Sequence, residues 1–331
     1  MNGEQGCLKS AMDFRSCNKN GPALSAIGIG SWAIGGNWKY GWGEQKDSDS
    51  IAAIETLFDL GANWIDTSPV YGLGHAETLI GKLQIRKKLF IATKGGLIWD
   101  SQGNVEKNLE PQSIRRECEQ SLKRLNVETI DLYQLHWPDP KRTYLAAWQE
   151  ILKMRDEGKI RFCGLSNFWI HDIKSCLELS GSGAEGLWSL QAPLSLLDRS
   201  FELNVLPFCS SSQVGFLGYS PLQNGLLTGN FSREKLNSLP ENDWRKKHKY
   251  FRSPFFERVL ANVEKMKSVA DELQLTPGQL ATAWALHRPG VTSVLLGARN
   301  AEQARAAYSS RMDEVPQSVF GKLEKFFEKS R

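Results

Sequence analysis

The chain has 331 residues, of which 41% are hydrophobic and 24% are charged, a composition typical of folded globular proteins. No apolar run approaches the roughly 18 residues that a membrane-spanning helix needs, and the net charge of +4 comes from interspersed acidic and basic residues. We therefore expect neither a membrane nor a nucleic acid as a partner.

The start of the chain has no apolar segment of the kind found in a signal peptide. We expect residues 1–11 to form a disordered or extended tail and residues 12–331 to form a single domain. The cysteines, at positions 7, 17, 118, 163, 176 and 209, show neither CxxC spacing nor a cluster with histidine. This pattern favours a reducing cytoplasm and predicts no bound metal.

Eight short apolar runs, rich in β-branched and aromatic residues, indicate strands along the chain. The predicted strands are 24–27, 62–65, 89–93, 130–135, 161–165, 186–190, 214–218 and 291–296. We interpret Gly28 and Gly30, which follow the first run, as parts of a tight turn at the edge of a cofactor. Eight strands alternating with helical segments predict an α/β fold of the TIM (β/α)8 barrel type, whose active site is built at the C-terminal ends of the strands.

Helical periodicity is clearest at 111–125, where apolar residues share one face and Pro111 suits the first turn. A long insertion follows the seventh strand. Its first part, 225–254, is rich in turn-forming residues, which is typical of a lid or specificity loop. Further helices are predicted at 255–273, at 276–287 and, as a C-terminal amphipathic helix, at 313–331.

Four reactive side chains fall at or just beyond the ends of three consecutive predicted strands: Asp66, Tyr71, Lys94 and His136. A lysine cation next to a tyrosine favours the phenolate and should lower the tyrosine pKa from its usual value of about 10. A carboxylate keeps the lysine charged, and an imidazole can orient a carbonyl oxygen. These groups suit carbonyl reduction, because charge builds up on oxygen as hydride reaches carbon. Each residue taken singly also has a purely structural interpretation.

Several segments resemble the motifs of the aldo-keto reductases, in that family's order from about residue 12 to the C-terminus. They are Trp64–Gly72, Ala92–Lys94, Asp131–Asp139, Gly158–Arg161 with Gly164–Phe168, Tyr219–Leu222 and Gly297–Asn300. The resemblance implies a (β/α)8-barrel oxidoreductase that uses NADPH to reduce a small-molecule aldehyde or ketone. It also implies that Tyr71 is the general acid, that Lys94 and Asp66 tune it, and that His136 positions the carbonyl.

The same resemblance implies a set of cofactor-binding residues. Ser166, Asn167 and Gln191 would hold the nicotinamide carboxamide, and Tyr219 would stack on the ring. The pyrophosphate would lie along Ser220, Pro221, Leu222 and Gly225. After the last strand the implied residues are Gly297, Ala298, Arg299, Asn300 and Gln303, of which the last four would meet the adenosine 2′-phosphate.

Tryptophans are dense in the predicted connections between strands and helices. Trp32, Trp38, Trp99 and Trp137 predict an aromatic substrate pocket, with core packing as the alternative. Two other functions stay open at this point. One is a cofactor-binding regulatory subunit with little turnover, and the other is a redox-neutral lyase or isomerase on the same barrel. The sequence does not indicate which oligomeric state the protein adopts.

Overall fold

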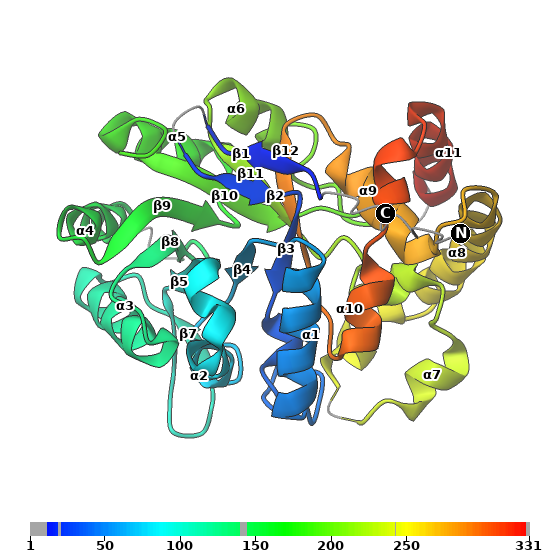
Figure 1. Ribbon diagram of the computed structural model, residues 1–331, viewed down its shortest axis with the longest axis horizontal. Coiled ribbons are helices and arrows are strands. Elements are labelled where there is room, and N and C mark those ends of the chain that lie inside the picture. Colours follow the sequence, from blue (N-terminus) through cyan, green and yellow to red (C-terminus); the bar gives the residue numbers. More distant parts are fainter. Residues whose placement is uncertain (1–11, 19–20, 140–143, 242, 329–331) are drawn as a thin grey trace, which may run out of the picture.

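The computed structural model describes residues 12–18, 21–139, 144–241 and 243–328, so the predicted tail at 1–11 lies outside the described residues (Figure 1). Eight parallel strands close into a barrel, with each strand paired to the next along the chain, which confirms the predicted fold. They are β3 (Ile27–Gly30), β4 (Trp64–Asp66), β5 (Phe90–Gly95), β8 (Ile130–Leu135), β9 (Ile160–Ser166), β10 (Leu187–Pro193), β11 (Gly215–Tyr219) and β12 (Val291–Leu296).

The first barrel strand lies later in the chain than predicted. Residues Ala23–Ser25 form β2, which pairs antiparallel with β1 (Phe14–Ser16) as a hairpin outside the barrel, and Ile27–Gly30 forms the barrel strand. The prediction of a turn at the two glycines is therefore wrong. Gly28 is required inside the strand for a different reason, because a Cβ there would lie 2.1 Å from the Trp64 ring.

Helices surround the barrel, as Figure 1 shows. Their bounds are α1 (Asp47–Asp59), α2 (His75–Lys82), α3 (Pro111–Leu125), α4 (Tyr144–Asp156), α5 (Ile170–Ser180), α6 (Val205–Ser211), α10 (Ala301–Ala307) and the terminal α11 (Gln317–Phe327). Helix α3 matches its prediction, with Pro111 in the first turn and Ile114, Cys118 and Leu125 buried. The terminal helix begins later than predicted because Ser310–Glu314 forms a separate 3-10 turn, η6, and Pro316 follows it.

The predicted insertion lies between β11 and β12. It contains η3 (Leu226–Thr228), α7 (Arg233–Ser238), η4 (Trp244–Lys247), η5 (Lys249–Phe251), α8 (Phe255–Glu272) and α9 (Pro277–Leu286). The start of α9 is set by a capping box, in which the Thr276 hydroxyl accepts from Gln279 N and the Gln279 side chain accepts from Thr276 N. A second excursion, the antiparallel pair β6 (Leu97–Trp99) and β7 (Val105–Lys107), follows β5.

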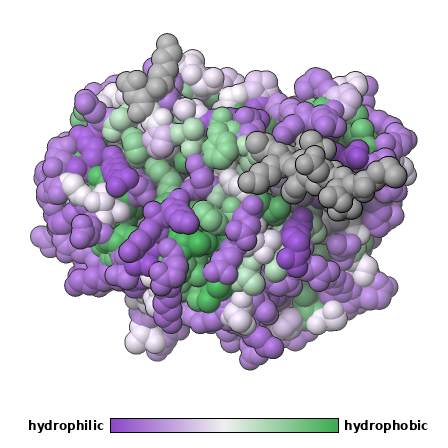
Figure 2. All heavy atoms as spheres, in the orientation of Figure 1, coloured by the Kyte–Doolittle hydropathy of each residue, from purple (hydrophilic) through white to green (hydrophobic). Residues whose placement is uncertain are grey.

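The two ends of the barrel differ in chemistry. Aromatic rings fill the N-terminal end, where Phe162 stacks on Trp188 at 4.6 Å and Phe90 packs against Trp188 at 5.5 Å between ring centres. Polar side chains gather at the C-terminal end instead. The face shown in Figure 2 is mainly hydrophilic. Among the described residues, no helix is both long and apolar enough to cross a membrane.

Candidate active site

The parallel ladder continues one residue past several strands and aligns the site residues. The backbone N–H of Thr67 donates to Ala92 O at 2.8 Å, that of His136 to Gly95 O at 2.9 Å, and that of Asn167 to Gln191 O at 2.9 Å. Because these bonds connect neighbouring strand ends, the side chains that follow each strand are held in register at one rim of the barrel.

A buried ion pair occupies the centre of this rim. Lys94 Nζ lies 2.5 Å from Asp66 Oδ1 and 3.0 Å from Thr67 O, and both side chains are almost fully buried. The second carboxylate oxygen, Oδ2, accepts from Gln191 Nε2 at 2.7 Å and from Gln134 Nε2 at 3.3 Å. Burial lowers the pKa of Lys94, and the Asp66 carboxylate raises it in opposition. The carboxylate thus supports the charged form of a lysine that has lost its water.

Tyr71 reaches the ion pair from the turn after β4. Its hydroxyl lies 3.3 Å from Lys94 Nζ, and its side chain stays partly exposed at the mouth. The expected lowering of the Tyr71 pKa is wrong for this structure. Burial raises the pKa of Tyr71 well above its ordinary value, and the Asp66 carboxylate raises it further. The main physical reason is that burial disfavours the charged phenolate, and the negative charge of Asp66 disfavours it further, so the phenol keeps its proton.

His136 lies beside the tyrosine, with 6.0 Å between the two ring centres. Burial lowers the pKa of His136 well below its ordinary value, and the Lys94 charge adds to this effect. The imidazole is therefore neutral. Its Nδ1 lies 3.2 Å from the Ser68 hydroxyl. When Ser68 donates this hydrogen bond, the ring proton resides on Nε2, which can then donate to a substrate oxygen.

The structure brings together the four residues predicted to meet the nicotinamide. Tyr219 donates through its hydroxyl to Asn167 Oδ1 at 2.8 Å, and the Asn167 amide donates to His136 O and to Ser166 Oγ, both at 3.0 Å. Gln191 contacts Asp66 as described above. These polar groups are directly linked to the reactive rim, through the backbone oxygen of His136 and the carboxylate of Asp66.

The next segment has an unusual backbone. The φ angles are 56° at Ser220, 45° at Gln223, 57° at Asn224 and 89° at Gly225. Left-handed conformations at residues other than glycine are uncommon and tend to occur at functional sites. The predicted pyrophosphate residues Ser220, Pro221, Leu222 and Gly225 all lie in this turn, directly after Tyr219.

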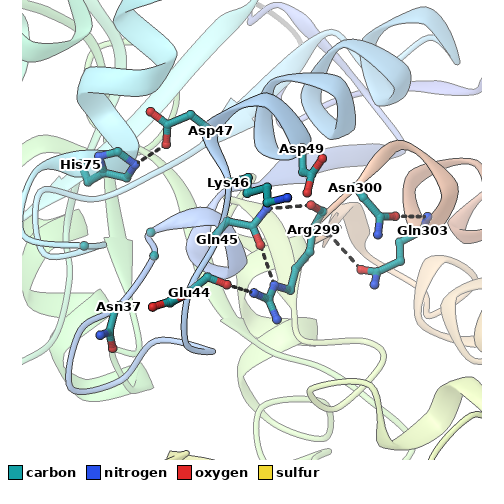
Figure 3. A pocket seen from close by; sticks show the side chains of 13 residues that line it. Asn37, Glu44, Gln45, Lys46, Asp47, Asp49, His75, Arg299, Asn300 and Gln303 are labelled. Atoms are coloured by element: carbon teal, nitrogen blue, oxygen red, sulfur yellow. Dashed lines mark hydrogen bonds and ion pairs between the residues drawn. The ribbon is translucent and has the colours of Figure 1, made fainter.

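A cavity of about 790 Å³ lies at the far end of the predicted cofactor site. Its lining includes Arg299, Asn300 and Gln303, which Figure 3 shows, and the glycines at 35, 36 and 72. Arg299 donates to Gln45 Oε1 at 2.7 Å and to Glu44 O, both of which are neutral acceptors. Within the residues that the structure describes, no carboxylate is hydrogen-bonded to this guanidinium. The residues present therefore fit an anionic group such as a ribose phosphate.

The four predicted pocket tryptophans have different surroundings. The Trp38 ring lies 6.4 Å from the Tyr71 ring, at the reactive rim. Trp32 instead packs against Trp244 of the insertion, with 5.3 Å between ring centres. Trp137 is 38% exposed beneath the Lys107 ammonium, and Trp99 lies in the hairpin strand β6. Their joint role as a substrate pocket stays a prediction.

Sequence reasoning missed three polar residues of the site: Ser68, Gln134 and Gln45. Ser68 lies inside the quoted motif and Gln134 precedes His136 by two positions in a strand, so alternation of side chains offered a signal for Gln134. Gln45 had no such signal. It lies far from Arg299 in the sequence and is uncharged.

The fold and the rim define a class of protein. A closed (β/α)8 barrel presents a protonated phenol, a buried lysine–carboxylate pair and a neutral imidazole at its C-terminal end. Such a set can donate a proton and a hydrogen bond to one oxygen atom, which is the chemistry that carbonyl reduction requires.

Comparison with known proteins identifies the family. The profile of the Aldo/keto reductase family matches residues 26–328. Aldo-keto reductase YhdN of Bacillus subtilis is 34% identical over 300 residues, covering 89% of this chain and 87% of its own. The NADH-specific methylglyoxal reductase of Escherichia coli is 33% identical over 300 residues, covering 85% and 88%. The chain belongs to the aldo/keto reductase family.

Solved structures agree with this assignment. The glycerol dehydrogenase AKR11B4 from Gluconobacter oxydans superposes with a TM-score of 0.83 at 33% identity, covering 98% of this chain and 96% of that one. The aldo-keto reductase AKR11C1 from Bacillus halodurans, at 22% identity and a TM-score of 0.74, shares the fold. The protein is therefore an oxidoreductase of the aldo/keto reductase family, with the barrel predicted from its sequence.

Proposed function

We propose that the protein uses NADPH to reduce an aldehyde or ketone to the alcohol, with Tyr71 as general acid. The observation that supports this most is the contact chain from Asp66 through Lys94 to the Tyr71 hydroxyl, at 2.5 and 3.3 Å. Related proteins named as a methylglyoxal reductase and a glycerol dehydrogenase are in line with chemistry on small carbonyl compounds and alcohols.

Each residue of the rim has a separate role in the proposed reaction. A bound nicotinamide supplies the hydride that reaches the carbonyl carbon. Tyr71 transfers its proton to the carbonyl oxygen as negative charge builds up there, and the neutral His136 donates a hydrogen bond to the same oxygen. Lys94 lies beside the phenolate that remains and stabilises it, while Asp66 holds the ammonium in place.

The cofactor would be held along one side of the barrel mouth. Ser166, Asn167 and Gln191 offer polar groups to a carboxamide, and Tyr219 offers a ring face. The preference for NADPH rests on Arg299, whose guanidinium faces the cavity described above. One relative is named as NADH-specific, so this preference needs its own test in this chain. Trp38 is the aromatic residue placed best to contact a substrate at Tyr71.

We also infer a reducing, cytoplasmic setting. The cysteines of the described residues, at 17, 118, 163, 176 and 209, are free and buried. Burial raises the pKa of Cys163 to about 12, which keeps it in the unreactive thiol form. Such cysteines pack as small apolar side chains.

The direct experiment is to follow the absorbance of NADPH with a panel of aldehydes and ketones for the wild type and for Tyr71→Phe. The variant keeps the ring and loses the proton, so its turnover should fall by roughly 100-fold or more. Its affinity for NADPH should stay unchanged. Near-normal turnover of the variant would show that Tyr71 is not the acid. A wild type that binds NADPH and consumes none with any carbonyl would contradict the proposed reaction.

A further inference from the structure

The side chain of Gln45 makes two hydrogen bonds to Arg299. The guanidinium Nε donates to Gln45 Oε1 at 2.7 Å, and Gln45 Nε2 donates back to the backbone oxygen of Arg299 at 2.7 Å. Figure 3 shows the amide and the guanidinium side by side, with a dashed line between them. The pair closes a ring that includes the Arg299 backbone, so the guanidinium has little freedom to turn.

Gln45 is itself held firmly by its neighbours. Its Nε2 also lies 3.0 Å from Ser50 Oγ in the first turn of α1. The preceding loop is attached to the insertion, because the Arg245 guanidinium lies over the Trp42 ring at 4.6 Å and Trp32 packs on Trp244. Two segments far apart in the sequence thus determine where the Gln45 amide lies.

The charges around the cavity make the position of Arg299 important. Glu44, Asp47 and Asp49 line the cavity together with Lys46, and Asp47 also contacts His75 at 2.8 Å. Arg245 lies near Arg299 and is paired with Asp243 at 2.7 Å. A phosphate would therefore meet no general excess of positive charge here. It needs direct contact with the Arg299 guanidinium.

The guanidinium has donors left for this contact. Its Nε and Nη2 each donate to the loop, and in the part of the chain that the structure describes no hydrogen bond involves Nη1. Both acceptors are neutral, so the full positive charge is retained. A neutral amide can hold the guanidinium without cancelling its charge, which a carboxylate at the same position would do.

From these contacts we propose that Gln45 sets the cofactor preference of this protein, by holding the charged Arg299 guanidinium where it meets the 2′-phosphate of NADPH. Gln45 is a positioning residue that acts through Arg299. The inference rests on the proposed use of NADPH and names a residue that decides it.

The test uses two probes of the adenosine end, 2′,5′-ADP and 5′-ADP, which differ by the phosphate in question. Their dissociation constants are measured by calorimetry for the wild type, Gln45→Glu and Gln45→Leu. Gln45→Glu places a carboxylate on the guanidinium and should weaken 2′,5′-ADP by roughly 10-fold or more, while 5′-ADP changes by less than about 2-fold. Gln45→Leu leaves the Arg299 charge unchanged and removes both hydrogen bonds to Gln45. It should also weaken 2′,5′-ADP more than 5′-ADP, by a smaller factor than Gln45→Glu does.

A matched control separates the contact from the added charge. Asn37→Asp also brings one carboxylate to the cavity lining, and in the described residues Asn37 has no bond to Arg299. It should weaken 2′,5′-ADP less than Gln45→Glu does. An equal effect of these two variants would overturn the proposal in favour of a general charge effect.

Three further results would overturn the proposal in distinguishable ways. If the wild type prefers 2′,5′-ADP and both Gln45 variants keep that preference, Gln45 has no positioning role. If the variants weaken both probes equally, Gln45 only supports the fold. If the wild type itself shows no preference between the probes, the NADPH assignment fails as well, whereas carbonyl reduction with NADH would remain to support the catalytic part of the proposed function.

Discussion

Replacement of Asp66 by asparagine should expose the energetics of the buried ion pair. The 2.5 Å contact between Lys94 Nζ and Asp66 Oδ1 is almost fully buried, and removal of one partner of such a pair typically costs about 3–5 kcal/mol. The asparagine amide also cannot accept from Lys94 and from Gln191 with the same geometry as a carboxylate, because only one of its two atoms is an acceptor.

The cost has an upper limit that depends on pH. Lys94 can lose its proton instead of remaining charged without a partner. Deprotonation of a lysine of ordinary pKa costs about 5 kcal/mol at pH 7, and this cost is the upper limit of the penalty. This limit falls by about 1.4 kcal/mol for each unit of pH. The Asp66→Asn variant should therefore be less stable than the wild type by about 3–5 kcal/mol at pH 7 and by about 2 kcal/mol or less at pH 9.

The sign follows from proton counting. The folded variant holds a neutral Lys94, whereas the unfolded chain holds a charged one below pH 10, so folding releases a proton and stability rises with pH. Urea denaturation followed by tryptophan fluorescence at pH 7, 8 and 9 measures the difference. The double variant Asp66→Asn/Lys94→Met removes the charge and should show no such slope relative to the wild type. A penalty for Asp66→Asn that is the same at pH 7 and pH 9 would refute this reasoning.

Two further predictions follow from Arg299 and Glu117. Arg299→Ala should weaken NADPH by roughly 10-fold to 150-fold, from the loss of about 1.5–3 kcal/mol of charge-assisted bonding. NADH binding, measured in parallel by tryptophan fluorescence quenching, should change little, and a parallel loss would contradict the 2′-phosphate role. Burial raises the pKa of Glu117 to about 7, so the folded state keeps this proton longer than the unfolded state does. The free energy of unfolding should therefore fall by about 3 kcal/mol as pH rises from about 4.5 to about 7. Glu117→Gln should remove that part of the pH dependence in denaturation curves, and unchanged curves would contradict it.

The barrel and the reactive rim were predictable because each depends on a local pattern. Short apolar runs mark strands, and Asp66, Lys94 and His136 directly follow three of them. The error at the first strand has a physical cause. Ala23–Ser25 has the composition of a strand and forms one, but it pairs with β1 in a hairpin, and no local pattern distinguishes that partner from the barrel.

The tyrosine shows a different limit of sequence reasoning. The position of Tyr71 beside Lys94 was predicted, but the direction of its pKa shift was not. That direction depends on how much burial outweighs the lysine charge and on how closely Asp66 approaches the same cation, at 2.5 Å against 3.3 Å for the phenol. Distances of this kind are set by packing in three dimensions. For the same reason the link between Gln45 and Arg299 became visible only in the structure.

The segment that carries Lys94 is also hydrogen-bonded to two carboxyl groups on different outer helices. Glu77 of α2 accepts from the Thr93 hydroxyl at 2.6 Å and pairs with Arg124 at 2.7 Å. Glu117 of α3 accepts from Gly96 N at 2.8 Å. Thr93 and Gly96, which flank Lys94 in the sequence, are thus hydrogen-bonded to separate helices. Because both attachments are buried, a shift of β5 along the barrel axis would break both. The height of the ammonium at the rim, and with it the 3.3 Å approach to Tyr71, therefore depends on the outer helices as well as on the barrel.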